Sequence, residues 1–207
     1  KNPLKQIFTV FKEEKIRKLS LAFFIYFIAF TGLTNILIFF LQESLGWTTK
    51  SSSGTLVVVG IIAIIVQGGL IGPLVKQFGE MRLTLIGSGF ILVACSLLIT
   101  TPKENATINI YSAVSFLAVG AGLITPTLRA LISKKLDVDK QGSILSNLQG
   151  LQSLGGVLGI AMAGRVYDSF GPKSPFIAGS VILLFMIYLI AEGKNNNSFN
   201  NQNSKVS

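Results

Sequence analysis

The stretch LSLAFFIYFIAFTGLTNILIFFL occupies residues 19–41 and contains no Asp, Glu, Lys or Arg. An α-helix rises about 1.5 Å per residue, so about 20 residues are needed to cross a hydrocarbon core of about 30 Å. A buried helix of a soluble protein usually ends after about 10–14 apolar residues, well before the end of this stretch. Residues 19–41 are therefore predicted to form a transmembrane helix.

Five further runs of the same kind follow, and the shortest is the last. They cover residues 54–75, 83–101, 108–128, 144–164 and 174–191. Over the whole chain 50% of the residues are hydrophobic and only 13% are charged, whereas soluble domains carry about 25% charged residues. We expect an all-α integral membrane protein with six transmembrane helices.

Positive charge lies mainly on one side of the predicted spans. All but four of the 18 Lys and Arg residues lie in the N-terminal segment, the second and fourth connections, and the tail. The four on the other side are Lys50, Lys103, Arg165 and Lys173. Since connections rich in Lys and Arg stay in the cytoplasm, we expect a multi-pass protein of the inner or plasma membrane with both termini cytoplasmic. Residues 1–18 are then a cytoplasmic linker, and the Asn-rich residues 193–207 are expected to form a disordered cytoplasmic tail.

The composition disfavours several functional classes. The chain has no His and a single Cys, Cys95, so neither a disulfide framework nor a typical metal site is expected. The runs offer no carboxylate dyad and no Ser–Lys pair, and we expect neither an enzyme nor a bound cofactor. The net charge of +9 follows from the topology and favours anionic lipid headgroups over nucleic acid as a partner.

A faint internal repeat relates the two halves of the chain. GPLVKQFG at residues 72–79 and GRVYDSFG at residues 164–171 share glycine, an aliphatic residue, phenylalanine and glycine at identical spacing. Each copy follows the second of three spans. Because three is an odd number, the two copies face opposite sides of the membrane. This pattern predicts an inverted three-plus-three repeat, as found in secondary transporters.

The order of these features resembles the C-terminal half of a major facilitator superfamily transporter, closest to its drug:proton antiporter branch. In that family's loop motif, G-x-L-x-D-R-x-G-R-K, Gly72, Leu74 and Gly79 match, whereas Lys76 stands in the place of the acid. The parts that resemble the family's tenth and eleventh helices are residues 120–126, 141–142, 158–159 and 164–168.

The resemblance covers residues 3–192 and implies that the chain is half of a transporter and a piece of a longer polypeptide. The implied partners are an N-terminal six-helix half, or a second copy, together with the lipid bilayer and a small-molecule substrate. The implied function is secondary active transport by alternating access, with export of small amphipathic compounds. Two alternatives stay open: a metabolite uptake facilitator of the same fold, and a six-span membrane scaffold without transport activity.

Uncharged side chains within the runs are candidates to line a substrate cavity, because an amide that faces lipid costs several kcal/mol. The candidates are Asn35, Gln67, Gln149, Gln152, Phe27, Thr31 and Thr125. Hydrogen bonds between helices explain the polar members equally well. The runs hold no acid or base, so proton coupling is expected to depend on acids in the other half.

Glycines, one proline and one acid are expected to shape packing and gating. The loop-motif and gating candidates are Gly72, Gly79, Gly164, Asp168, Gly171 and Pro126. We expect Asp168 to pair with Arg165 or Lys173 at the external end of its helix. Gly155 and Gly159 lie four residues apart, a spacing of small residues that lets two membrane helices approach closely.

Overall fold

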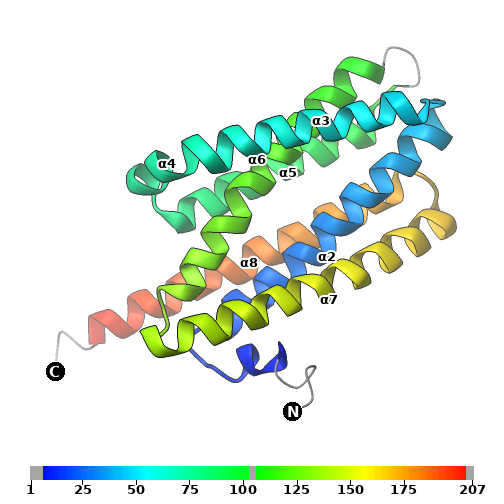
Figure 1. The fold of residues 1–207 in the computed structure, drawn as a ribbon. Helices are drawn as coiled ribbons and strands as arrows, with labels where there is room; N and C mark the ends of the chain where they lie inside the picture. The colour runs from blue at the N-terminus through cyan, green and yellow to red at the C-terminus, as the bar shows by residue number, and fades with distance from the viewer. Residues whose placement is uncertain (1–6, 103–105, 204–207) are drawn as a thin grey trace.

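The computed structural model describes residues 7–102 and 106–203, with side chains up to Glu192. These residues form helices joined by short connections, and the described part of the chain contains no strand. The elements are the 3₁₀ helix η1 (Phe8–Phe11), α2 (Arg17–Phe39), η2 (Phe40–Ser44), α3 (Thr49–Ile65), η3 (Val66–Leu70), α4 (Ile71–Phe78), α5 (Glu80–Thr100), α6 (Ala106–Ser133), α7 (Val138–Phe170) and α8 (Ser174–Asn203). The π-helical turns η2 and η3 continue α2 and α3 without a break (Figure 1).

Six helical segments coincide with the six uncharged runs. Among the described residues, five segments are long and apolar enough to cross a membrane: Arg17–Ser44, Thr49–Phe78, Glu80–Thr100, Ala106–Ser133 and Ser174–Glu192. The sixth, α7, has 33 residues, or about 50 Å of helix, and its amides and serines make it more polar than the others. It packs along α2 (Figure 1). The expected all-α membrane fold is confirmed.

The helices extend past the uncharged runs. Long basic side chains at a helix end can reach water along the helix surface, so a charge does not end the helix. The largest difference concerns the tail, where α8 continues to Asn203 although disorder was expected from residue 193. Extending an existing helix adds a hydrogen bond per residue without a new nucleus. The remaining parts of the expected linker and tail, residues 1–6 and 204–207, lie outside the described residues.

The six segments form two groups of three (Figure 1). α2 packs against α7 and α8, whereas α6 packs against α3 and α5. The first helix of each three-helix repeat is thus held by the second and third helices of the other repeat. Contacts between α2 and α6, and between α5 and α8, join the two groups. This reciprocal pairing confirms the inverted three-plus-three arrangement, and α2 begins at the end of the bundle where α8 ends (Figure 1).

Glycines set the closest contacts between helices. A Cβ at Gly159 of α7 would lie 2.3 Å from the carbonyl oxygen of Ile28 in α2, and one at Gly120 of α6 would lie 2.6 Å from that of Gly87 in α5. At Gly155 it would lie 3.2 Å from another carbonyl oxygen of α2. The backbones touch directly at these points, which increases dispersion contact between the helices. The predicted close approach at Gly155 and Gly159 is confirmed, with α2 as the partner.

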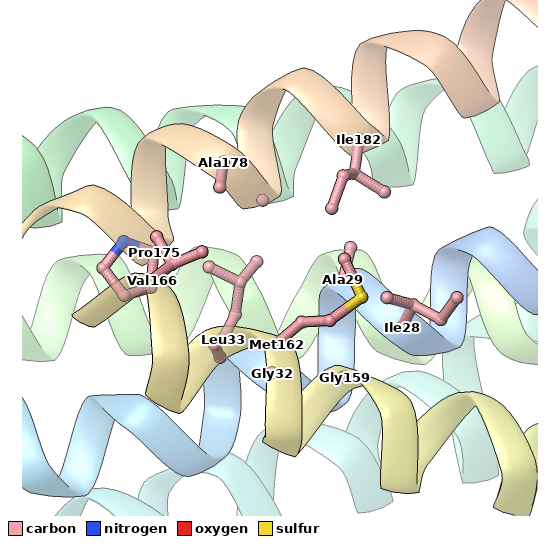
Figure 2. A pocket seen from close by; sticks show the side chains of 12 residues that line it. Ile28, Ala29, Gly32, Leu33, Gly159, Met162, Val166, Pro175, Ala178 and Ile182 are labelled. Atoms are coloured by element: carbon pink, nitrogen blue, oxygen red, sulfur yellow. The ribbon is translucent and has the colours of Figure 1, made fainter. Parts of the chain in front are cut away.

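A small cavity of about 40 Å³ lies where α2, α7 and α8 meet (Figure 2). Glycines and apolar side chains line it, among them Leu33, Met162 and Ile182. A space of this size holds little more than a water molecule, and the lining offers no polar side chain to bind one. It is a gap in the packing and not a ligand site.

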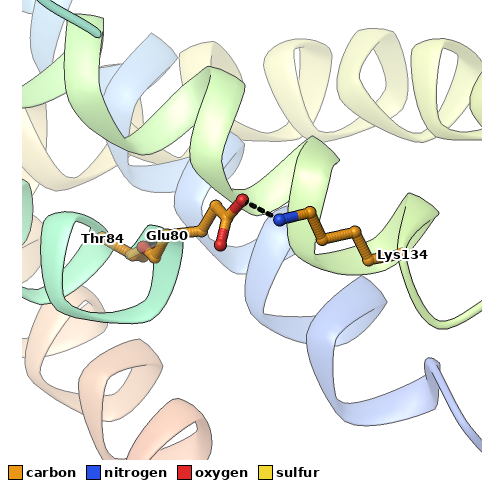
Figure 3. Close-up of polar contacts among 3 residues, drawn as sticks. All are labelled: Glu80, Thr84 and Lys134. Carbon is orange, nitrogen blue, oxygen red and sulfur yellow. Dashed lines mark hydrogen bonds and ion pairs between the residues drawn. The ribbon is translucent and has the colours of Figure 1, made fainter. Parts of the chain in front are cut away.

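Among the described residues, three ion pairs join helix ends at the end of the bundle where α2 begins. Glu80, the first residue of α5, pairs with Lys134 just after α6, and Thr84 one turn along donates to the Glu80 carbonyl oxygen at 2.9 Å (Figure 3). The other two pairs are Lys18–Glu192 at 2.9 Å and Lys140–Glu13 at 3.4 Å. Each pair has at least one exposed member, so each contributes at most about 1 kcal/mol.

Candidate functional site

Polar side chains from three helices meet beside the contact between α2 and α6. The hydroxyl oxygens of Tyr26 in α2 and Thr125 in α6 are 3.2 Å apart. Tyr26 is fully buried, and its ring stacks on Phe30 with the centroids 5.5 Å apart. Since residues four apart share one face of a helix, Arg129 follows Thr125 on the face of α6 that meets α2.

Arg129 connects α6 to α7. Its Nη2 donates hydrogen bonds to Oε1 of Gln149 at 2.7 Å and to Oε1 of Gln152 at 2.6 Å. The two glutamines are three residues apart and therefore share a face of α7. The guanidinium also lies over the ring of Phe23, with Cζ 5.8 Å from the centroid, which is a cation–π geometry. Its Nε is buried and has no hydrogen-bond partner among the described residues.

The helix that carries Arg129 is longer than the uncharged run suggested. The uncharged run ended at residue 128, which placed Arg129 in a connection outside the membrane. The helix instead continues to Ser133, and the Arg129 side chain meets α7 at Gln149, about 16 Å along that helix from Val138. Amide oxygens and an aromatic face solvate the charge there. Arg129 is half-buried and Gln149 is exposed, and an ionisable group held between two helices of a membrane bundle is a candidate functional residue.

A cavity of about 140 Å³ adjoins this polar group and is enclosed by α2, α3, η3 and α6. Its lining residues are Phe30, Thr34, Val59, Ala63, Gln67, Leu117, Ala118, Ala121, Gly122 and Thr125. Gln67 lies in the π-helical turn η3, an irregularity often found at functional sites. Thr125 belongs both to the cavity wall and to the contact with Tyr26. A mainly apolar wall with a few polar groups is typical of small-molecule sites.

The predicted cavity candidates divide between this site and other places. The structure brings Gln67, Thr125, Gln149 and Gln152 to the cavity or to Arg129. Asn35 is exposed and donates to the Thr31 carbonyl oxygen of its own helix at 2.9 Å. Neither Asn35 nor Thr31 is among the residues that line the cavity. Phe27 is 4% exposed and packs on Phe23 and Tyr26 in the core.

Comparison with known families decides what kind of protein carries this site. The family model described as the Major Facilitator Superfamily matches residues 1–160. The chain belongs to the major facilitator superfamily. Its members are membrane transporters rather than enzymes, which agrees with the apolar helices described above.

The relatives of this superfamily member are distant and longer. A tetracycline resistance protein, class H, of Pasteurella multocida is 28% identical over 133 residues, which cover 64% of this chain and 32% of the relative. Hippocampus abundant transcript-like protein 1 of Homo sapiens is 22% identical over 212 residues, covering 92% and 41%. Major facilitator superfamily domain-containing protein 10 of Mus musculus is 24% identical over 178 residues, covering 84% and 38%. The matched part of the chain therefore spans 32–41% of the length of these relatives.

The two copies of the superfamily loop motif end in the same backbone geometry. Gly79 after α4 has a φ of 76°, and Gly171 after α7 has a φ of 91°. Only glycine adopts positive φ without strain, so it terminates the helix in both copies. Gly72 and Gly164 lie inside α4 and α7, where an added Cβ would meet no atom within 4 Å. Pro126 lies inside α6, and the gating role of these residues stays a prediction.

Asp168, the acid of the second copy, does not form the expected ion pair. It is exposed, and the part of the chain that the structure describes gives it no ion pair. Lys173 instead donates to the Thr101 carbonyl oxygen at 3.3 Å, at the end of α5. The neighbouring Tyr167 donates to Oε2 of Glu43 at 3.0 Å and so ties α7 to η2. Burial raises the pKa of Tyr167, which keeps it a protonated donor at neutral pH.

Sequence reasoning missed Tyr26 and Arg129, although both left a signal. Tyr26 lies between Phe23 and Phe30 at helical spacing, so the three rings share one face of α2. Arg129 follows Thr125 by one turn, before any residue that would end α6. Searching for uncharged runs hides both side chains, because it counts tyrosine as apolar and ends a span at the first charge.

Proposed function

We propose that the chain is one half of a secondary active transporter that works by alternating access and exports small amphipathic compounds. The observation that carries this proposal is the cavity beside the Tyr26–Thr125 contact, where the first helices of the two inverted repeats meet. Substrate sites of secondary transporters lie at such repeat interfaces. The apolar wall, with Gln67 and Thr125 as its polar groups, suits compounds that have an apolar body and few polar atoms.

The other half is proposed to be an N-terminal six-helix bundle or a second copy of this chain. Alternating access requires two bodies that move against each other, and this chain covers only 32% and 41% of two longer relatives. The segment Thr49–Phe78 offers a surface for such a partner, since only 11% of its most apolar stretch of 18 residues is buried within this chain. The distribution of Lys and Arg supports a position in the inner or plasma membrane with both termini cytoplasmic.

Export is supported by one relative in particular, the tetracycline resistance protein, because removing a drug from the cell confers resistance. The alternative is a facilitator of the same fold that takes up metabolites through the same cavity. A scaffold without transport activity is a third possibility, and it gives no reason for a cavity with Gln67 and Thr125 in its wall.

A transport assay on the complete polypeptide that carries this chain tests the proposal. Inside-out vesicles from a bacterial host without its own drug exporters should, when energised, accumulate at least one of two amphipathic dyes, the cation rhodamine 6G or the anion fluorescein. Gln67→Leu and Thr125→Val, which remove the polar atoms and keep the size, should lower accumulation. Asn35→Leu, outside the cavity, is the matched control and should not. Accumulation only in right-side-out vesicles would support uptake, and no movement of either dye in either orientation would support the scaffold.

A further inference from the structure

Arg129 is a half-buried cation between α6 and α7, and the described residues form no ion pair with it. Its neighbours Gln149, Gln152 and Phe23 provide amide oxygens and a ring face. The ion pairs among the described residues involve three lysines and leave Arg129 out. A charge that is partly removed from water is destabilised unless it is paired, and amide oxygens compensate it only in part. The site therefore favours the arrival of a negative group.

The guanidinium also has hydrogen-bonding capacity left. Both bonds to the glutamines come from Nη2, while the buried Nε has no partner in the described part of the chain. Arginine has five N–H donors in a rigid plane, and a carboxylate accepts two of them in parallel. A buried donor without a partner is costly, so an incoming acceptor gains more here than at the protein surface.

We propose that Arg129 binds the anionic group of the transported compound, so that the substrates are amphipathic organic anions. Arg129 lies one helical turn, about 6 Å, from Thr125 on the same face of α6, and Thr125 lines the 140 Å³ cavity. A compound whose apolar ring contacts Phe30 beside Thr125 in the cavity places its carboxylate one turn away, at the guanidinium. This inference rests on the proposed function and adds the charge of the substrate.

The competing interpretation is that Arg129 only braces α6 against α7. Gln152→Glu separates the two, because it keeps the side-chain size and puts a carboxylate where Oε1 already accepts from Nη2 at 2.6 Å. If Arg129 binds a substrate anion, the new carboxylate competes with that anion and repels it. If Arg129 is only a brace, the new ion pair strengthens the brace and leaves ligand binding unchanged.

The experiment measures binding of 2-naphthoate and of its uncharged analogue 2-naphthylmethanol by titration calorimetry. It uses the complete polypeptide that carries this chain, in lipid nanodiscs. The unaltered protein should bind 2-naphthoate at least about tenfold more tightly than the alcohol, as expected for a charge-assisted hydrogen bond. Arg129→Gln and Gln152→Glu should reduce this preference to less than about twofold, whereas Arg129→Lys should keep part of it. Lys134→Gln, an exposed cation nearby, is the control and should keep the preference.

Equal affinity of the unaltered protein for both probes would overturn the proposal, and that measurement needs no variant to fold. A preference that survives in Gln152→Glu, or is lost in Lys134→Gln, would overturn it too. Transport of the same probes into vesicles is scored separately. If 2-naphthoate binds but does not move, the proposed function fails and the anion site stands. If rhodamine 6G moves and no anion preference exists, the function stands and the anion site fails.

Discussion

Gly159→Ala adds one methyl group at the closest approach of α7 to α2. The new Cβ would lie 2.3 Å from the carbonyl oxygen of Ile28 and 3.1 Å from the amide nitrogen of Gly32, and both are backbone atoms that cannot rotate away. The two helices must therefore separate locally by about 1 Å. Overpacking of this kind costs about 1–3 kcal/mol, whereas alanine in place of glycine inside a helix returns about 0.5–1 kcal/mol. We expect a net destabilisation of about 1–2 kcal/mol.

Thermal unfolding of the detergent-solubilised protein measures this loss. A change of about 1–2 kcal/mol corresponds to a decrease in Tm of about 2–8 °C for a chain of this size. Gly142→Ala is the matched control in the same helix, because its Cβ would meet no atom within 4 Å. Gly32→Ala loosens the same contact, since its Cβ would lie 2.8 Å from the Gly159 carbonyl oxygen, and its effect should not add fully to that of Gly159→Ala. If Gly159→Ala and Gly142→Ala have the same Tm, the backbone contact between α2 and α7 is refuted.

The other predictions concern the orientation of the chain in the membrane, transport by the isolated chain, the Glu80–Lys134 ion pair and the charged residues of the loop motif. Cysteines placed in residues 48–52 should react with impermeant reagents outside intact cells and those in residues 134–140 should not; the reverse pattern would overturn the orientation. The chain reconstituted alone should drive no substrate-dependent proton flux, because the acids expected to carry protons lie in the other half; flux from the isolated chain would make that half dispensable. Glu80→Gln and Lys134→Gln in a double-mutant cycle should show a coupling of about 0.2–1 kcal/mol that shrinks in high salt, and additive effects would show that the pair contributes nothing. Asp168→Asn and Lys76→Ala should each leave the transport rate unchanged, because Asp168 is exposed and forms no ion pair among the described residues; a lowered rate in Asp168→Asn would show that its charge acts in another conformation.

Part of the candidate site could be read from the sequence because it depends on local chemistry. An amide cannot face lipid without cost, so Gln67, Gln149 and Gln152 were expected to meet protein or a wet cavity, and the structure places them at the cavity or at Arg129. The same argument also named Asn35, which is exposed and instead donates to the Thr31 carbonyl oxygen of its own helix. Sequence reasoning missed Arg129 because a charged side chain was expected to lie in water. In the structure its guanidinium donates to Gln152 of α7 and lies over the ring of Phe23.

The sequence by itself determined the number of helices, their alternating directions and the inverted relation of the two repeats. Each of these depends on a local demand: uncharged length for a span, and glycine wherever φ must be positive, as at Gly79 and Gly171. Only the tertiary structure decided that α2 pairs with α7 and α8 rather than with its neighbours in the chain, and that Arg129 faces Gln149 and Gln152. A helix shows in its own sequence that a polar or small side chain needs a partner, but the partner lies on another helix. Which helix approaches is set by the packing of all six together.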